Sequence, residues 1–193
     1  MDINFKSKNT IAAIYPVSHY HEFLSKSFNS LLSQINYLNE IIIIYDNVDK
    51  KCIHCLNQLT LKLSNHNFKK IKFLNTDKTG AGNTRMFGIN NSNSKYLAFL
   101  DSDDIWPSNY ISDRITFINK NRHEFTSSSY IYYNHLSNYR LHVKSVFTKI
   151  SYIKLLFYNW IGNSTVIIKK DLLLRANGYS NLLKRNDYCT WLN

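Results

Sequence analysis

The chain has 193 residues, 44% of them hydrophobic and 15% aromatic, which is the composition of one globular domain with a core of its own. Five glycines and two prolines exclude a collagenous or linker-like chain. The formal net charge of +11 suits an anionic partner, such as a nucleic acid, a membrane surface or a phosphorylated substrate. A chain rich in Lys, Asn, Ile and Tyr also arises from an AT-rich genome without selection for binding.

Cysteines and apolar runs indicate the compartment. Cys52, Cys55 and Cys189 are too few, and odd in number, for a disulfide framework, which favours a reducing compartment. The first ten residues lack the apolar core of a signal peptide, and no stretch reaches the roughly 18 apolar residues of a membrane span. We expect a cytoplasmic protein that can touch the inner membrane from its surface. No nucleic-acid motif is present, so we expect no nucleic-acid partner.

Strands and helices alternate in the first half of the sequence. Continuous apolar runs predict strands, and these lie over residues 11–15, 40–45, 71–74 and 96–100. Three helices are predicted between these strands. The first follows a Ser18 N-cap and extends to Ile35, the second covers residues 50–65, and the third runs from Gly80 to Asn90. Such an alternation predicts an α/β fold with a mostly parallel sheet and helices on both faces. Ligands of these sheets bind beyond the carboxyl ends of the strands, where Asp46 and Asp101 would come together.

The pattern changes after Pro107. A helix carries Ile111, Ile115 and Ile118, and further elements are predicted as strands over 130–133, 141–147 and 164–168 and helices over 151–160 and 171–176. The helix over 151–160 mixes lysines with apolar and aromatic residues. We expect it to pack in the core with its lysines at the rim, although an interfacial helix shows the same mixture.

Acidic residues cluster where the fourth predicted strand ends. Asp101, Asp103 and Asp104 are separated by Ser102 alone and are followed by Trp106 and Pro107. Carboxylates so close together repel one another unless a cation lies among them. Their hard oxygen ligands suit Mn²⁺ or Mg²⁺, which keeps few protein ligands and completes its shell with water and substrate phosphates. The alternative is an acidic first turn of a helix on a surface loop.

Five blocks of sequence together resemble glycosyltransferase family 2. The blocks are Ile14–Val17 with Ser30–Gln34, Glu40–Asn47, Gly80–Tyr96, Leu100–Pro107, and Arg185–Tyr188 with Trp191 and Leu192. Each block is weak alone, but their joint order and spacing are specific. They span residues 10–192. The resemblance implies a GT-A-like, Rossmann-like α/β fold with a small C-terminal acceptor-side region.

The resemblance also implies roles for individual residues. The donor nucleotide would lie beside Pro16 and Val17, with Asp46 at its base and Arg85 close by. Asp101-Ser102-Asp103 matches the D-x-D motif, with Asp103 as the metal ligand and Asp101 near both the ribose and the metal. Asp187 matches the catalytic base.

These roles imply a metal-dependent, inverting enzyme. A nucleotide sugar, expected to be a UDP-sugar, would give its sugar to an acceptor hydroxyl of a surface polysaccharide or lipid-linked glycan. Residues 1–107 would form the nucleotide-sugar-binding half and residues 108–193 the acceptor-side half, together in one compact domain. Family members usually continue beyond the base, so we expect this chain to be truncated.

Two alternatives stay open at this point. A binding module that holds nucleotide sugar without transferring it is compatible with the short C-terminus. A haloacid-dehalogenase-like phosphatase would use Asp101 as its nucleophile, because that motif also follows an apolar strand. The phosphatase motif normally lies near the N-terminus and continues with Thr or Val, where this chain has Ile105.

Overall fold

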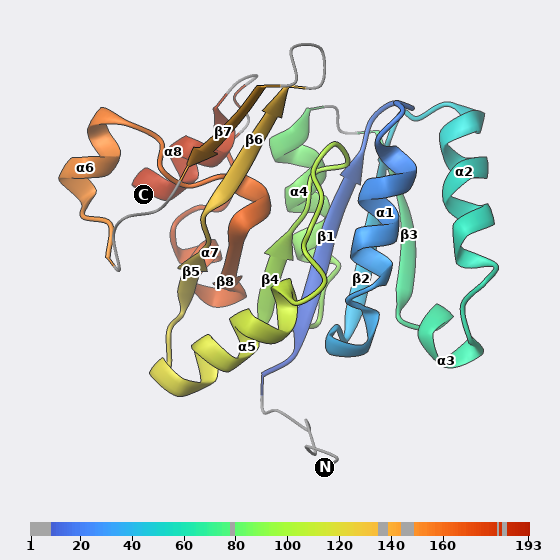
Figure 1. Ribbon diagram of the computed structural model, residues 1–193, viewed down its shortest axis with the longest axis horizontal. Helices are drawn as coiled ribbons and strands as arrows, with labels where there is room; N and C mark the ends of the chain where they lie inside the picture. The colour runs from blue at the N-terminus through green and yellow to red at the C-terminus, as the bar shows by residue number, and fades with distance from the viewer. Residues whose placement is uncertain (1–8, 78–79, 135–138, 144–148, 181, 183–184) are drawn as a thin grey trace.

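A six-stranded sheet in the order β3-β2-β1-β4-β8-β5 forms the centre of the computed structural model (Figure 1). The structure describes residues 9–77, 80–134, 139–143, 149–180, 182 and 185–193. The strands of this sheet are β1 Ile11–Val17, β2 Glu40–Asp46, β3 Ile71–Thr76, β4 Tyr96–Phe99, β5 Phe125–Ser127 and β8 Val166–Lys169. A separate hairpin is formed by β6 Tyr130–Asn134 and β7 Tyr139–Val143.

The sheet is mostly parallel, as the sequence predicts. Strand β1 pairs in parallel with β2 and β4, and β2 pairs in parallel with β3. Strand β8 runs antiparallel to both β4 and β5. The direction of β8 was not predicted, and the short β5 was not expected at all.

Helices cover both faces of the sheet, which is also confirmed. On one face Ile41 and Ile43 pack with α1 (Leu24–Leu32), α2 (Lys50–Thr60) and α5 (Tyr110–Asn121). On the other face Ile42 and Ile44 pack in a second core with α4 Ala81–Asn90, α6 Tyr152–Phe157, α7 Lys170–Arg175 and α8 Asn186–Leu192. Two covered faces explain why β1, β2 and β4 read as unbroken apolar runs rather than as alternating ones.

Several boundaries differ from the sequence prediction. Helix α1 begins at Leu24 with Phe23 at its N-cap, and the Ser18 hydroxyl contacts His19 instead of capping it. The helix expected over 50–65 is divided into α2 and a short α3 (Asn65–Phe68) that is capped by Ser64. Residues 144–147 of the expected strand 141–147 lie outside the described residues. Two 3₁₀ turns, η1 Ile35–Tyr37 and η2 Asn163–Thr165, were not predicted.

Helix α6 corrects a further expectation, because most of its apolar residues do not pack in the core. Among its six residues Leu155 is buried, whereas Ile153 and Phe157 are exposed. The helix is also shorter than the predicted 151–160. Apolar residues at helical spacing do not reveal whether they are covered by protein or by lipid. The sequence therefore could not show whether this helix packs in the core.

The strand order places a crevice at the carboxyl edge of the sheet. The chain leaves β1 toward β2 and β3 on one side, whereas β4 pairs on the other side of β1, so the order reverses between β1 and β4. Ligands of open α/β sheets bind at such a reversal. Strand β8 of the second half pairs with β4 of the first, so one sheet crosses the predicted division at residue 107. No helix within the described ranges is both long and apolar enough to cross a bilayer.

Candidate active site

A cleft of about 1510 Å³ opens at the carboxyl edge of the sheet. Its walls come from the ends of β1 and β2, the start of α4, the loop after β4, strand β6, the segment around η2 and the start of α8. Every site residue predicted from the sequence lines this cleft, namely Pro16, Val17, Asp46, Arg85, Asp101, Ser102, Asp103 and Asp187. The fold thus brings them together, while their individual roles stay predictions.

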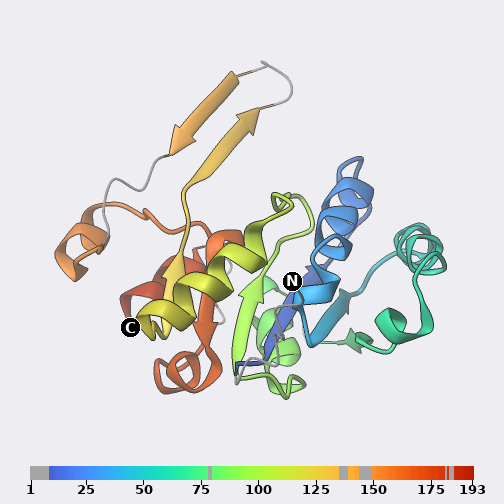
Figure 2. The same cartoon turned by 60° about the horizontal axis from the view of Figure 1, so that its bottom comes forward.

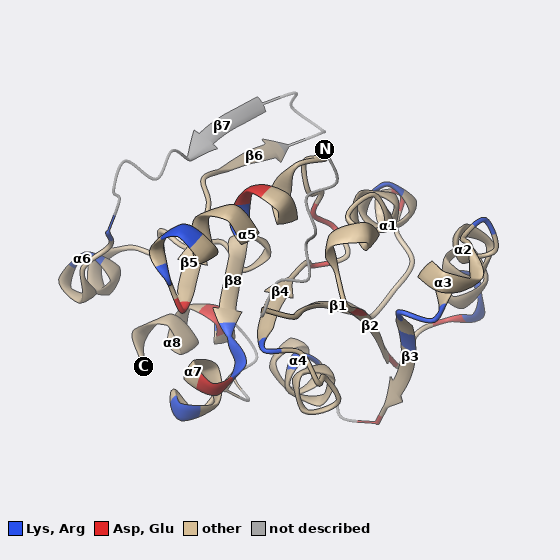
Figure 3. Ribbon diagram, turned by 90° about the horizontal axis from the view of Figure 1, so that it is seen from below, with Lys and Arg blue, Asp and Glu red and all other residues tan. Residues whose placement is uncertain are grey.

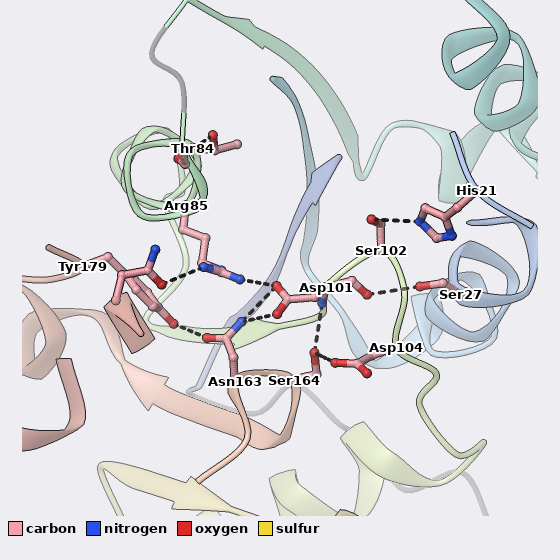
Figure 4. A network of polar contacts seen from close by, with 12 residues as sticks. His21, Ser27, Thr84, Arg85, Asp101, Ser102, Asp104, Asn163, Ser164 and Tyr179 are labelled. Carbon is pink, nitrogen blue, oxygen red and sulfur yellow. Dashed lines mark hydrogen bonds and ion pairs between the residues drawn. The ribbon is translucent and has the colours of Figure 1, made fainter. Parts of the chain in front are cut away.

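Asp101 is the centre of a network of polar contacts (Figure 4). Its Oδ1 lies 2.5 Å from Nη2 of Arg85 in a salt bridge. The side-chain amide of Asn163 donates to both carboxylate oxygens, at 3.0 and 3.1 Å. Tyr179 fixes that amide in turn, because its hydroxyl donates to Oδ1 of Asn163 at 2.6 Å. The orientation of the Asp101 carboxylate is therefore set by neighbours on three separate elements.

Ser164 connects the loop after β4 to η2. Its Oγ accepts a hydrogen bond from the backbone N–H of Asp101 at 3.0 Å and donates one to Oδ2 of Asp104 at 2.5 Å. The indole N–H of Trp106 donates to the carbonyl oxygen of Ser164 at 2.7 Å. Three residues of the acidic loop are thus tied to η2.

The third carboxylate of the cluster is turned inward. Burial of the Asp104 carboxyl raises its pKa to about 6, and the hydrogen bond from Ser164 works against this rise. The charges of Asp101 and Asp103 raise the pKa further. Asp104 as a whole residue is exposed, and its side chain points to Ser164 (Figure 4). Asp104 thus lines the cleft while one of its carboxylate oxygens is held by Ser164.

Arg85 connects the acidic loop with helix α8. Its Nη1 donates to Oδ1 of Asn186 at 3.3 Å, so one guanidinium group joins Asp101 to the residue before Asp187. Burial opposes the positive charge of Arg85, but Asp101 outweighs it and raises the pKa of Arg85 above its ordinary value. The amide oxygen of Asn186 serves here as the acceptor.

Asp187 lies in the first turn of α8 and lines the cleft. Burial raises the pKa of Tyr130 in β6, and electrostatic interactions with Tyr158, Asp187 and Asp104 raise it further. The ring of Tyr130 rests on Gly162, where an added Cβ would lie 3.3 Å from two ring carbons. Tyr130 thus lines the cleft within electrostatic reach of both Asp187 and Asp104.

Asp46 links the end of β2 to the start of α4. Its Oδ2 accepts hydrogen bonds from the backbone N–H of Gly80 at 3.1 Å and from the Thr84 hydroxyl at 3.0 Å. Gly80 has φ of 99°, a conformation that favours glycine. Gly82 is required for close packing, since a Cβ there would lie 2.2 Å from the carbonyl oxygen of Ser180. These two glycines position the start of α4, which lines the cleft through Ala81, Thr84 and Arg85.

The donor set around Asp103 fits a divalent cation held mainly by its substrate. Asp103 is exposed in the cleft and forms no hydrogen bond or ion pair with the residues that the structure describes. Both oxygens of Asp101 already accept hydrogen bonds. No group of three or more His, Cys, Asp or Glu side chains in the described ranges is arranged to hold a metal by itself. Mg²⁺ and Mn²⁺ commonly use one or two carboxylates together with substrate phosphates, and Asp103 offers one such carboxylate.

Some residues of the cleft were missed by sequence reasoning. His21 was not among the predicted site residues, yet its Nε2 lies 3.2 Å from Oγ of Ser102. Burial lowers the pKa of His21, while the nearby Asp103 works against this shift. Asn163, Ser164 and Tyr130 were also missed. The small polar run Gly162–Thr165 before an apolar strand was the signal that could have identified the first two.

Comparison with known proteins identifies the family. The model of "Glycosyl transferase family 2" matches residues 13–181. The UDP-Glc:alpha-D-GlcNAc-diphosphoundecaprenol beta-1,3-glucosyltransferase WfgD of Escherichia coli is 29% identical over 184 residues, which cover 94% of this chain and 68% of WfgD. A second E. coli enzyme of the same description, WfaP, is 31% identical over 121 residues, or 59% of this chain and 44% of WfaP.

Solved structures share the fold. The crystal structure of S. aureus TarS 1-349 superposes with a TM-score of 0.74 at 17% identity, covering 95% of this chain and 56% of TarS 1-349. The mannosyltransferase PcManGT from Pyrobaculum calidifontis, in complex with GDP-Man and Mn²⁺, gives a TM-score of 0.68 at 11% identity, covering 96% of this chain and 51% of PcManGT. This chain therefore spans about half the length of these structures and has the GT-A fold. With the family model matching residues 13–181, the chain belongs to glycosyl transferase family 2.

Proposed function

We propose that the cleft transfers a sugar, with inversion, from a UDP-sugar to a hydroxyl of a lipid-linked glycan in surface-polysaccharide synthesis. The observation that carries the proposal is the meeting of Asp46, Asp103 and Asp187 in one cleft, although they lie far apart in the sequence. WfgD and WfaP, whose names describe UDP-glucose donors and diphosphoundecaprenol-linked acceptors, support the substrate class. TarS, which was crystallised with UDP and with UDP-GlcNAc, supports the nucleotide.

The donor would lie across the ends of β1, β2 and β4. Pro16 and Val17 flank the base and ribose in this proposal, and Asp46 contacts the base through the oxygen that α4 does not occupy. Asp101, fixed by Arg85 and Asn163, is directed at the ribose end of the diphosphate. A carboxylate whose orientation is already fixed loses little conformational freedom when the donor binds, and this favours donor affinity.

Asp103 would hold Mn²⁺ or Mg²⁺ together with the donor phosphates. When bound, the ion supplies positive charge to the departing diphosphate. Asp101 can contribute less to ion binding than expected from the motif, because both of its oxygens already accept hydrogen bonds.

Asp187 would accept the proton of the attacking hydroxyl. Sugar transfer passes through an oxocarbenium-like state, and inversion requires a carboxylate on the face opposite the leaving group. Asp187 lines the cleft from α8, whereas Asp103 lines it from the loop after β4, so the base and the diphosphate ligand belong to separate elements. We propose a cytoplasmic location at the inner-membrane surface, where such acceptors lie.

The phosphatase alternative is not favoured by the geometry. A phosphatase nucleophile needs an unhindered carboxylate oxygen, and Asp101 instead forms a salt bridge with Arg85 and accepts two hydrogen bonds from Asn163. The presence of Asp187 in the cleft, together with the ligand-facing Asp103, supports transfer over a module that only binds the donor.

A transfer assay tests the proposal. The protein is incubated with Mn²⁺, radiolabelled UDP-, GDP- or dTDP-sugars and a GlcNAc-diphospho-lipid, and the anomeric configuration of the product is determined. We expect transfer from a UDP-sugar with inversion, dependent on Asp187 and on the metal. Retention of configuration, or donor binding without transfer to any acceptor tested, would contradict the proposal.

A further inference from the structure

One flank of the molecule exposes a concentrated apolar surface. Helix α6 and the residue after it present five large side chains to solvent, namely Tyr152, Ile153, Leu156, Phe157 and Tyr158. Phe157 is 85% exposed and Ile153 67% exposed. We call these five residues the α6 patch. Single exposed apolar residues are ordinary, but five within seven consecutive residues indicate a surface that binds something.

The α6 patch is held firmly on the body of the protein. Leu155, on the opposite side of the helix, is buried in the core beside Ile161 and Trp191. The Tyr188 hydroxyl of α8 donates to the carbonyl oxygen of Leu155. The Ser151 side chain caps the start of the helix through the backbone N–H of Lys154. The exposed side chains therefore stand on an anchored turn of helix.

Between Glu124 and Asp171 the sequence has no Asp or Glu, and the basic residues next to or within the patch are Lys149 and Lys154. Lys169 and Lys170, further along the chain, are engaged elsewhere, with Glu124 and with the carbonyl oxygen of Ser92. Figure 3 shows no acidic residue on α6 or β6. An apolar surface of a soluble partner does not require such a charge bias. An anionic lipid surface does, because basic residues near it add attraction to the insertion of apolar side chains.

The position of the α6 patch relates it to the cleft. Asn159 and Ile161 directly follow it in the sequence and line the cleft. Burial raises the pKa of Tyr130, and Tyr158 of the patch lies close enough to Tyr130 to add to this rise. Strand β6, which adds the exposed Ile131 and Tyr132, extends from the same flank (Figure 2). A surface bound at α6 would thus lie beside the acceptor side of the cleft.

We propose that the α6 patch docks on an anionic phospholipid bilayer, with Ile153 and Phe157 inserted between headgroups and with Lys149 and Lys154 at the phosphates. Tyr152 and Tyr158 suit the interface, where an aromatic ring can be apolar at one end and hydrated at the other. Apolar insertion and basic charge act together, as stable peripheral binding requires. The purpose of the docking, to present a lipid-linked acceptor to the cleft, rests on the proposed function, whereas the docking itself does not.

Vesicle flotation tests the docking. The full chain is mixed with vesicles of phosphatidylcholine alone, or of phosphatidylcholine and phosphatidylglycerol in equal parts. We expect binding to the mixed vesicles that weakens as salt is added. The double variant I153S/F157S should bind the mixed vesicles roughly tenfold less or weaker still, because two large apolar side chains no longer insert. Leu61→Ser is the matched control, since Leu61 is 74% exposed at the end of α2, and its binding should equal that of the wild type.

Two results would overturn the inference. One is equal vesicle binding by the double variant and the wild type, or no binding by the wild type. The other is a dimer in sedimentation velocity that the double variant abolishes, because the patch would then face a second copy. Thermal stabilisation by UDP-sugar and Mn²⁺ should be the same in all variants, which shows that they are folded. Flotation without sugar transfer would refute the proposed function alone, and transfer to a soluble acceptor without flotation would refute the docking alone.

Discussion

The salt bridge between Arg85 and Asp101 joins helix α4 to the loop after β4 at the centre of the cleft, with 2.5 Å between Nη2 and Oδ1. The Arg85 side chain is 7% exposed and that of Asp101 is 26% exposed. A buried guanidinium needs its counter-charge, whereas the carboxylate is open to the cleft on one side. The pair thus serves both the stability of the fold and the orientation of Asp101.

Removing one partner of this pair should destabilise the protein more than removing both. We expect Asp101→Asn to lower the free energy of unfolding by about 1–3 kcal/mol, because it leaves the Arg85 charge buried without compensation and solvent screens part of the loss. The double variant R85M/D101N should recover part of that loss. Denaturant unfolding without nucleotide or metal measures both. The exposed pair Lys169–Glu124 provides the control, and Glu124→Gln should have a smaller effect. Additive effects of the two cleft substitutions would contradict the coupling.

Asp104 should make stability depend on pH in the absence of divalent metal. Its folded-state pKa of about 6 lies above the ordinary value of about 3.9, so the folded state binds the proton more tightly than the unfolded state. The contribution of Asp104 to stability therefore falls as the pH rises from about 4 to about 6 and is constant above. Asp104→Asn keeps an acceptor for Ser164 and removes this dependence. The melting temperature of the variant relative to the wild type should rise across that interval. A difference independent of pH would refute this account of Asp104.

Gly82 should not tolerate a methyl group. The Cβ of an alanine would lie 2.2 Å from the carbonyl oxygen of Ser180, so either α4 or the segment before α8 must move. We expect Gly82→Ala to cost about 1–3 kcal/mol in denaturant unfolding, despite the better helix propensity of alanine. Asn90→Ala, at an exposed position of the same helix, should be neutral or stabilising. A Gly82→Ala variant as stable as the wild type would show that the approach to Ser180 is not tight.

Substitutions at Asp187 and Asp103 should impair different functions, sugar transfer and metal-dependent donor binding respectively. Asp187→Asn should reduce transfer by roughly 10²–10⁴-fold and leave nucleotide-sugar binding intact, because it removes a proton acceptor and no donor contact. Asp103→Asn should abolish the part of donor binding that depends on metal. Steady-state kinetics and calorimetry separate the two effects, with Asp113→Asn, an exposed carboxylate on α5, as the control. Loss of donor binding in Asp187→Asn would contradict the role of base.

The parts of the fold that the sequence reveals are those governed by local pattern. Strand β2 was predicted because four isoleucines buried on both faces leave few alternatives, and Asp46 and Asp101 were paired because parallel strands end at one edge. The start of α1 was predicted wrongly because Ser18 has the chemistry of a cap, and the chain makes its turn at His21–Phe23 before the helix begins.

Tertiary contacts explain what could not be predicted. The antiparallel direction of β8 depends on how the chain returns past α5, which periodicity does not encode. Asn163 lies 62 residues from Asp101, and no short motif marks such a contact. The exposure of α6 was not foreseen because apolar spacing is the same whether protein or lipid covers the helix.

The most direct test of the central claim is calorimetric titration of the folded protein with UDP-sugars, once with Mn²⁺ and once with chelator. Our account predicts saturable binding that requires the metal and that Asp46→Ala and Asp103→Asn each weaken. No heat of binding from any nucleotide sugar in the presence of Mn²⁺, or binding that neither substitution changes, would contradict it.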